Sequence, residues 1–146
     1  MEQELEKDTM RNDSSTLTHS EDRHLQSNAN IASQIQEVLE RLQQNQILMP
    51  QPGEVRDYLL RFFDIVDLLQ PVCESAREKF GAGTQLSLEV YRDPEINDEY
   101  VTLYARQKNY DAKIMDTIEK ISSEFDEKLT KSSGWLLLTT DFNPPR

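Results

Sequence analysis

The sequence predicts a small α+β domain, in which a three-stranded antiparallel sheet packs against helices on one face. Two patterns predict this class. Apolar residues recur at helical spacing before residue 80 and again over 111–131, whereas they alternate with polar residues between 85 and 106. Composition sets the extent of the domain, because 6 of the first 30 residues are hydrophobic against 47 of the following 116. We therefore expect one folded domain over 31–146.

The first 30 residues are expected to form a disordered acidic tail. They contain no aromatic residue, and their few apolar side chains cannot bury enough surface to offset the entropy of ordering. The chain begins with acidic rather than basic residues, and its longest uninterrupted apolar run is the four residues 135–138. We therefore expect neither a targeting peptide nor a membrane span, and a cytoplasmic location.

The first two helical segments precede the strands. An amphipathic helix is predicted over 31–46, and it ends before Pro50 and Pro52 in a connector at 47–53. Residues 54–80 predict one or two further helices, because Pro71 removes a backbone hydrogen bond within the segment. The run Gly81-Ala82-Gly83 then ends the helix, since glycine readily adopts the left-handed conformation of a helix cap.

Two strands, 85–92 and 99–106, predict a β-hairpin. In each strand every second side chain is apolar and faces the core. The apolar residues of the two strands share that face only if the numbers of paired residues add to an odd number, and this condition restricts the register. The register that leaves a six-residue loop at 93–98 pairs residues whose numbers add to 191. The resulting pairs are Arg92–Glu99, Val90–Val101, Leu88–Leu103 and Leu86–Ala105.

The last two elements are a helix over 111–131 and a strand over 135–142. The helix brings the chain back, so the last strand is expected to run along the second strand and antiparallel to the first. We place it beside the first strand, which gives the order 2-1-3 and a fully antiparallel sheet. The helices at 54–80 and 111–131 are expected on one face of this sheet.

The other face of the sheet is unusually aromatic and is the candidate partner-binding surface. Two interpretations are open: either the helix at 31–46 folds over this face, or the face or that helix is a docking surface for another chain. The residues that we expect to contact a partner are Tyr91, Tyr100, Tyr104, Arg106 and Trp135.

Several kinds of chemistry are disfavoured. The only histidines, His19 and His24, lie in the tail, so the predicted domain has no imidazole for a nucleophile–base pair or a zinc site. The single Cys73 is expected to be a small buried hydrophobe. Weak metal-ligand candidates are found in the hairpin loop, which lacks the glycine and the final acid of a calcium-binding loop. These candidates are Asp93, Glu95 and Glu99.

The composition favours a protein partner. The chain carries 27 acidic and 16 basic residues, a formal charge of -11, and its basic residues are scattered among acids. We therefore expect no binding to nucleic acid or to a membrane surface, and no cofactor. The sequence predicts a non-catalytic protein–protein interaction or regulatory module, which associates with another protein or with itself. The alternative is a small-ligand or metal-dependent enzyme domain that uses carboxylates and tyrosines.

Overall fold

The computed structural model describes residues 29–146, of which residues 35–146 form one compact unit. The expected tail therefore lies almost wholly outside the described residues. A helix covers 29–44. The elements that follow are β1 (Ile47–Leu48), α2 (Pro52–Arg61), the short 3-10 helix η1 (Phe63–Ile65), α3 (Val66–Phe80), β2 (Thr84–Asp93), β3 (Asp98–Gln107), α4 (Ile114–Thr130) and β4 (Leu136–Thr139).

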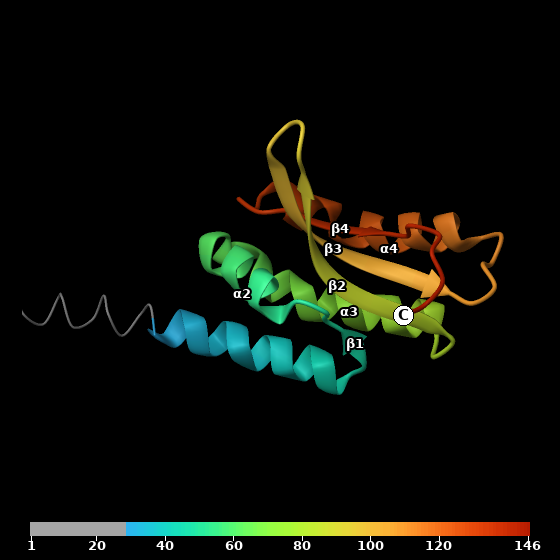
Figure 1. The fold of residues 1–146 in the computed structure, drawn as a ribbon, viewed down its shortest axis with the longest axis horizontal. Coiled ribbons are helices and arrows are strands. Elements are labelled where there is room, and N and C mark those ends of the chain that lie inside the picture. Colours follow the sequence, from blue (N-terminus) through green and yellow to red (C-terminus); the bar gives the residue numbers. More distant parts are fainter. Residues whose placement is uncertain (1–28) are drawn as a thin grey trace, which may run out of the picture. The chain divides into compact units, whose positions relative to one another are not determined.

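The sheet is mixed and four-stranded, with the order β1-β2-β3-β4, so the predicted three-stranded antiparallel sheet is wrong (Figure 1). Strands β2 and β3 pair antiparallel, whereas β1 pairs parallel with β2 and β4 pairs parallel with β3. The last strand runs along the second strand, as expected, but it lies beside the second strand rather than the first. The physical reason is that β1, which the sequence places in a connector, already occupies the free edge of β2.

The hairpin register is confirmed. Val90 pairs with Val101 and Arg92 with Glu99, and every other pair of the ladder also adds to 191. The ladder extends one pair further than expected, to Asp93 and Asp98, and leaves a four-residue turn. Within that turn Asn97 has a φ of 53°, a left-handed conformation that asparagine tolerates better than most residues.

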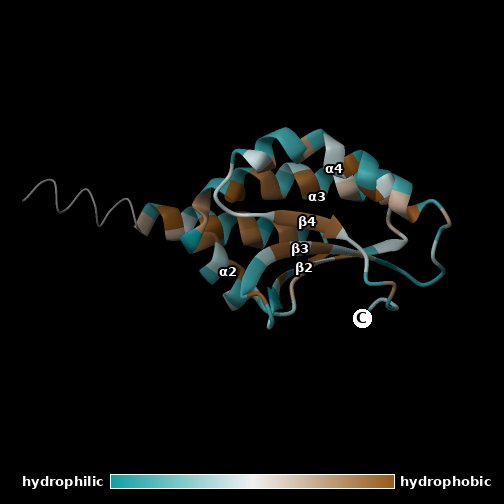
Figure 2. Cartoon of the chain, turned by 90° about the horizontal axis from the view of Figure 1, so that it is seen from above, coloured by the Kyte–Doolittle hydropathy of each residue, from teal (hydrophilic) through white to brown (hydrophobic). Residues whose placement is uncertain are grey.

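One face of the sheet forms the core. Leu86, Leu88 and Leu103 are fully buried there, and Figure 2 shows α3 and α4 covering the same side of the sheet. The helical region over 52–80 is two helices, which is one of the two expected alternatives. The break lies at Phe62, and α3 accommodates Pro71 within its length. Helix α3 ends at Phe80, and the φ of 77° at the following Gly81 confirms the predicted glycine cap.

The helix at 29–44 does not cover the aromatic face with its residues from 35 onwards. Ile35, Leu39 and Leu42 are buried. Gln36 accepts a hydrogen bond from Arg56 of α2, and Val38 lines a shallow groove with residues of α3. This part of the helix therefore packs on α2 and α3 (Figure 1), and the interpretation that it folds over the aromatic face is wrong. Within 29–146, no helix is long and apolar enough to cross a membrane.

Candidate binding surface

The second face of the sheet carries three exposed or half-exposed aromatic side chains near the hairpin, and we call Tyr91, Tyr100 and Trp135 the aromatic surface. Tyr91 and Tyr100 are cross-strand partners, and their rings stack with centroids 5.1 Å apart. Trp135 immediately precedes β4, and its carbonyl accepts a hydrogen bond from Val101 at 3.1 Å. Its position in the register is therefore next to Tyr100. Tyr91 is 39% exposed and Trp135 is 40% exposed.

Residues of the α2–α3 region hold the segment that presents Trp135. The Tyr58 hydroxyl, buried in α2, accepts a hydrogen bond from the Trp135 backbone N–H at 3.0 Å. The Asp64 carboxylate accepts two more from Ser133, from its backbone N–H at 2.7 Å and from its hydroxyl at 2.9 Å. The backbone bond from Ser133 is the main reason that the pKa of Asp64 is lowered. The approach to β4 is thus fixed by three hydrogen bonds.

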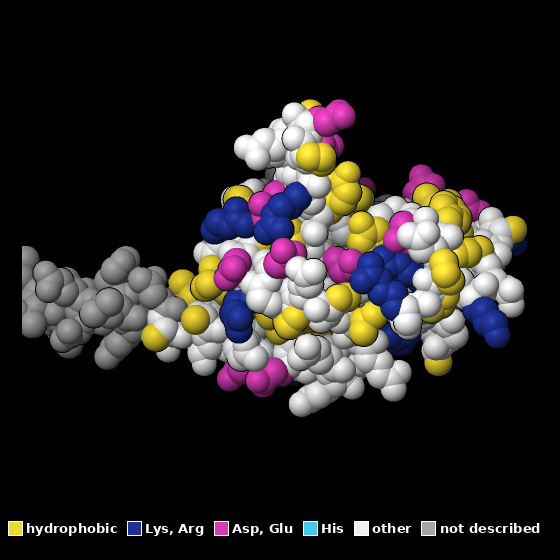
Figure 3. All heavy atoms as spheres, in the orientation of Figure 1, with side chains coloured by type: hydrophobic (Ala, Val, Ile, Leu, Met, Phe, Trp, Pro, Cys, Tyr) yellow, Lys and Arg dark blue, Asp and Glu magenta, His cyan; other side chains and the backbone are white. Residues whose placement is uncertain are grey.

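Acidic side chains flank the two stacked tyrosines. Asp93 and Asp98 lie directly opposite each other, two residue pairs beyond Tyr91 and Tyr100 and therefore on the same side of the hairpin by the alternation of the strands. The pKa of Tyr100 is raised, first by partial desolvation and then by Tyr91 and the negative charges of Asp98 and Asp93. Figure 3 shows hydrophobic side chains along the hairpin and acidic ones at its tip.

The far half of the same face is closed by an ion-pair cluster. Arg106 is only 2% exposed, and its guanidinium lies 4.6 Å from the centroid of the Tyr104 ring. It donates hydrogen bonds to Asp141, the shortest at 2.8 Å, and one to Glu89 at 3.1 Å. The hydrogen bonds from Arg106 are the main reason that the pKa of Asp141 is lowered to about 2.

The C-terminal segment lies against this half of the face. Gln85 and Arg146 exchange two hydrogen bonds, of 3.0 and 2.9 Å, between the glutamine amide and the arginine backbone. Arg146 also donates to Glu89 at 3.4 Å, and Tyr110 donates to the Asn143 carbonyl. The chain therefore covers one half of the face with its own end and leaves the aromatic surface open.

The predicted contact residues consequently divide into two groups. Tyr91, Tyr100 and Trp135 lie together at the open end. Tyr104 is half-buried beneath the guanidinium of Arg106, and Arg106 itself is buried and fully engaged within the chain. Arg106 therefore holds the C-terminal segment through its hydrogen bonds to Asp141.

The three weak metal candidates are not brought together. Glu99 pairs with Arg61 and, at 3.4 Å, with Arg92, on the opposite side of the hairpin from Asp93. Asp93 accepts a hydrogen bond from the backbone of Glu95 at 2.9 Å within the turn. Within the described part of the chain, no group of three or more acidic, cysteine or histidine side chains has the geometry to hold a metal ion.

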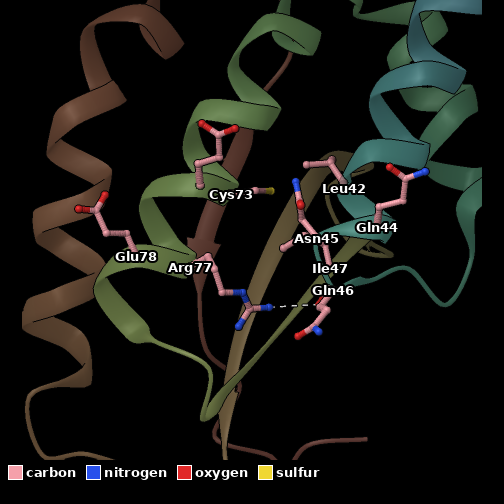
Figure 4. A pocket seen from close by; sticks show the side chains of 9 residues that line it. Leu42, Gln44, Asn45, Gln46, Ile47, Cys73, Arg77 and Glu78 are labelled. Atoms are coloured by element: carbon pink, nitrogen blue, oxygen red, sulfur yellow. Dashed lines mark hydrogen bonds between the residues drawn. The ribbon is translucent and has the colours of Figure 1, made fainter.

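A separate pocket of about 560 Å³ lies between α3 and the segment that leads into β1 (Figure 4). Leu42, Ile47, Cys73 and Arg77 are among the residues that line it. The Arg77 guanidinium donates to three backbone carbonyls, among them Gln46 at 3.1 Å. Burial raises the pKa of Cys73 to about 12, so its thiol remains protonated and is a poor nucleophile.

Sequence reasoning missed two parts of this surface. The expected register already placed Asp98 opposite Asp93 at the ends of its loop, so the acidic pair beside the tyrosines could have been found by extending the ladder. Asp141 had no such signal, because it lies 35 residues from Arg106 and beyond the last strand.

No protein family model, curated protein or solved structure matches this chain. A proposal about function therefore rests on the physical character of the surface.

Proposed function

We propose that this domain is a non-catalytic protein-interaction module that binds another protein through the aromatic surface. The observation that carries the proposal is that two large aromatic side chains, Tyr91 and Trp135, remain about 40% exposed although the same face is closed elsewhere by the chain's own end. Tyrosine and tryptophan are enriched at protein interfaces because they bury much area with few rotatable bonds.

The aromatic surface is also held in place before any partner arrives. The Tyr91–Tyr100 stack limits the rotation of both rings, and the hydrogen bond that the Trp135 backbone N–H donates to the Tyr58 hydroxyl fixes the backbone of Trp135. A surface that is ordered in advance loses less conformational entropy on binding, which increases affinity for a given contact area. This feature supports a binding role for the surface.

The chemistry of the remaining residues favours binding over catalysis. Residues 29–146 contain no histidine, and the buried thiol of Cys73 has a raised pKa. The carboxylates of Glu99 and Asp93 point to opposite sides of the hairpin. A nucleophile with an adjacent base is the usual requirement of covalent catalysis, and these groups do not supply one.

The test is affinity capture with the full chain as bait. The double variant Tyr91→Ala/Trp135→Ala removes most of the aromatic surface, and Met115→Ala is the matched control, because Met115 is a large apolar residue of α4 that is 49% exposed. We expect a stoichiometric partner to be retained by the parent and the control and lost by the double variant. Equal retention by all three baits, or capture of nothing but the bait, would contradict the proposal.

A change in folding must be separated from a change in binding. Circular dichroism and thermal unfolding of each variant provide this control, because partly exposed side chains contribute little to the core. Sedimentation equilibrium of the parent shows whether the captured partner is a second copy of the chain.

A further inference from the structure

We propose that the partner, whose binding to the aromatic surface is the function proposed above, is a basic protein segment that places an arginine guanidinium over the Tyr91–Tyr100 stack and against Asp93 and Asp98. This inference rests on that function and specifies the chemistry of the partner. Four side chains of one hairpin face carry it.

The open end of the face carries two acidic side chains. Asp93 and Asp98 are directly opposite each other in the antiparallel ladder, an arrangement in which like charges destabilise the pair of strands. Neither carboxylate makes an ion pair with any residue that the structure describes. Among the described residues, the groups that donate hydrogen bonds to them are the backbone N–H groups of Glu95 and Glu99. A cation placed between them would relieve the repulsion.

The other acids of the hairpin show the contrast. Glu99 is neutralised by Arg61 and Arg92, and Glu89 is neutralised by Arg106 and by Arg146 at the C-terminus. The chain therefore supplies its own basic partners to carboxylates elsewhere on these two strands. Within residues 29–146, no basic side chain pairs with the two acids beside the aromatic surface.

The two ends of the face resemble each other in the side chains that they carry. At the closed end, a guanidinium lies 4.6 Å from the centre of a tyrosine ring and contacts the carboxylates of Glu89 and Asp141. The open end presents the same kinds of group, namely tyrosine rings and two carboxylates, without the guanidinium. The cluster around Arg106 thus shows, on the same sheet, how this set of groups holds an arginine.

Arginine suits the tyrosine ring and the two carboxylates better than lysine does. A planar guanidinium stacks on an aromatic ring and offers several N–H donors to two carboxylates at once, whereas an ammonium is a compact and strongly hydrated charge. The ring of Tyr91 is exposed enough to accept a flat cation. Arginine is therefore the better occupant.

The net charge of the chain acts on a partner at long range. The formal charge of -11 speeds the approach of a basic segment and repels a second copy of this chain. A second copy would bring the same unpaired Asp93 and Asp98 to the interface. Charge complementarity thus favours a basic partner over self-association.

The experiment uses the full chain and three synthetic nine-residue peptides of glycine, serine and leucine, which differ only at two central positions. These positions hold arginine, lysine or citrulline, the neutral isostere of arginine. Binding is followed by the movement of backbone amide signals in the ¹⁵N NMR spectrum. We expect the largest movements at Tyr91 and Tyr100, and an affinity for the arginine peptide about fivefold or more above that for citrulline, with lysine between them.

Charge variants then test the two carboxylates. Asp93→Asn/Asp98→Asn removes two charges at the surface, and Asp116→Asn/Asp126→Asn removes two from the exposed side of α4 as the matched control. We expect the first variant to weaken binding of the arginine peptide about fivefold and the control to leave it within twofold. Equal affinity for the arginine and citrulline peptides, or equal binding by the two variants, would overturn the inference.

The same charge variants separate this inference from the proposed function. In the capture experiment, loss of the partner from the aromatic variant but not from Asp93→Asn/Asp98→Asn would leave the interaction module standing and refute a basic partner. Loss from both variants, with retention by the Asp116→Asn/Asp126→Asn control, is the result that we expect. Recovery of a second copy of the chain as the partner would also overturn the inference.

Discussion

Replacing Arg106 with methionine tests how the closed half of the sheet face is held. Methionine keeps much of the aliphatic volume of the side chain and removes the guanidinium, which donates three hydrogen bonds to Asp141 and one to Glu89. Removing one member of a buried ion pair costs about 3–5 kcal/mol, because the remaining charge loses its partner. The carboxylates of Asp141 and Glu89 are 27% and 21% exposed, so water replaces part of the lost interaction.

We therefore expect Arg106→Met to lower the free energy of unfolding by about 2–3 kcal/mol, between the buried and exposed cases. For a domain of this size the loss corresponds to a Tm lower by about 10 °C. The assay is urea unfolding followed by circular dichroism, with Arg61→Met as the matched control. Arg61 pairs with Glu99 but is 52% exposed, so its replacement should cost less than about 1 kcal/mol. A loss from Arg106→Met below about 1 kcal/mol would refute the reasoning.

The same contact makes a prediction about acid. The folded state lowers the pKa of Asp141 from 3.8 to about 2, chiefly through hydrogen bonds from Arg106. A carboxyl whose pKa is lowered on folding stabilises the protein above its ordinary pKa, and this stabilisation is lost as the pH falls through the folded value. The stability of the parent should therefore contain a component that disappears between about pH 4 and pH 2 and that is absent from Arg106→Met. Parallel stability profiles of the two proteins over that interval would contradict this assignment.

Three further predictions concern the packing of the domain. Gly134→Ala should destabilise the domain by about 1–3 kcal/mol, because the added Cβ would lie 2.7 Å from the Cβ of Phe62, whereas Gly83→Ala adds a Cβ into open space and should be nearly neutral in thermal unfolding. Tyr58→Phe removes the hydroxyl that accepts a hydrogen bond from the backbone before β4, and urea unfolding should show a loss of about 1 kcal/mol. The buried Cys73 should react with a thiol reagent only on unfolding, as its pKa of about 12 implies; rapid labelling of the native protein at neutral pH would contradict this.

The sequence predicted the hairpin well because the governing rule is local. Side chains alternate strictly along a strand, so Leu88 and Leu103 can share the core face only in registers of one parity. The position of each outer strand depends instead on which distant segment pairs with the free edges of β2 and β3. β1 is only two residues long, at Ile47 and Leu48, and follows a helix, so it carries no periodic signal. Yet it takes the edge of β2 and leaves β4 beside β3.

Part of the candidate surface was predicted because strand alternation is a local rule. The expected register placed Tyr91 opposite Tyr100, so strand alternation by itself indicated an aromatic face. The closure of the other half depends on the C-terminal segment, which folds back so that Asp141 meets Arg106 and Arg146 meets Gln85. Contacts of this range leave no local pattern in the sequence. Because the sequence gives no sign of this closure, Arg106 was expected to be exposed on the face and to contact a partner. It is buried within the chain.

The most direct test of the central claim is photo-crosslinking of the full chain in cells of the source organism. A benzophenone amino acid replaces Tyr91 in one variant, Trp135 in a second and Met115 of α4 in a third. The account predicts that the first two positions crosslink to the same basic protein and that the third does not. A partner that crosslinks equally from Met115, or the absence of any intermolecular product from Tyr91 and Trp135, would contradict the claim that the aromatic surface is the binding site.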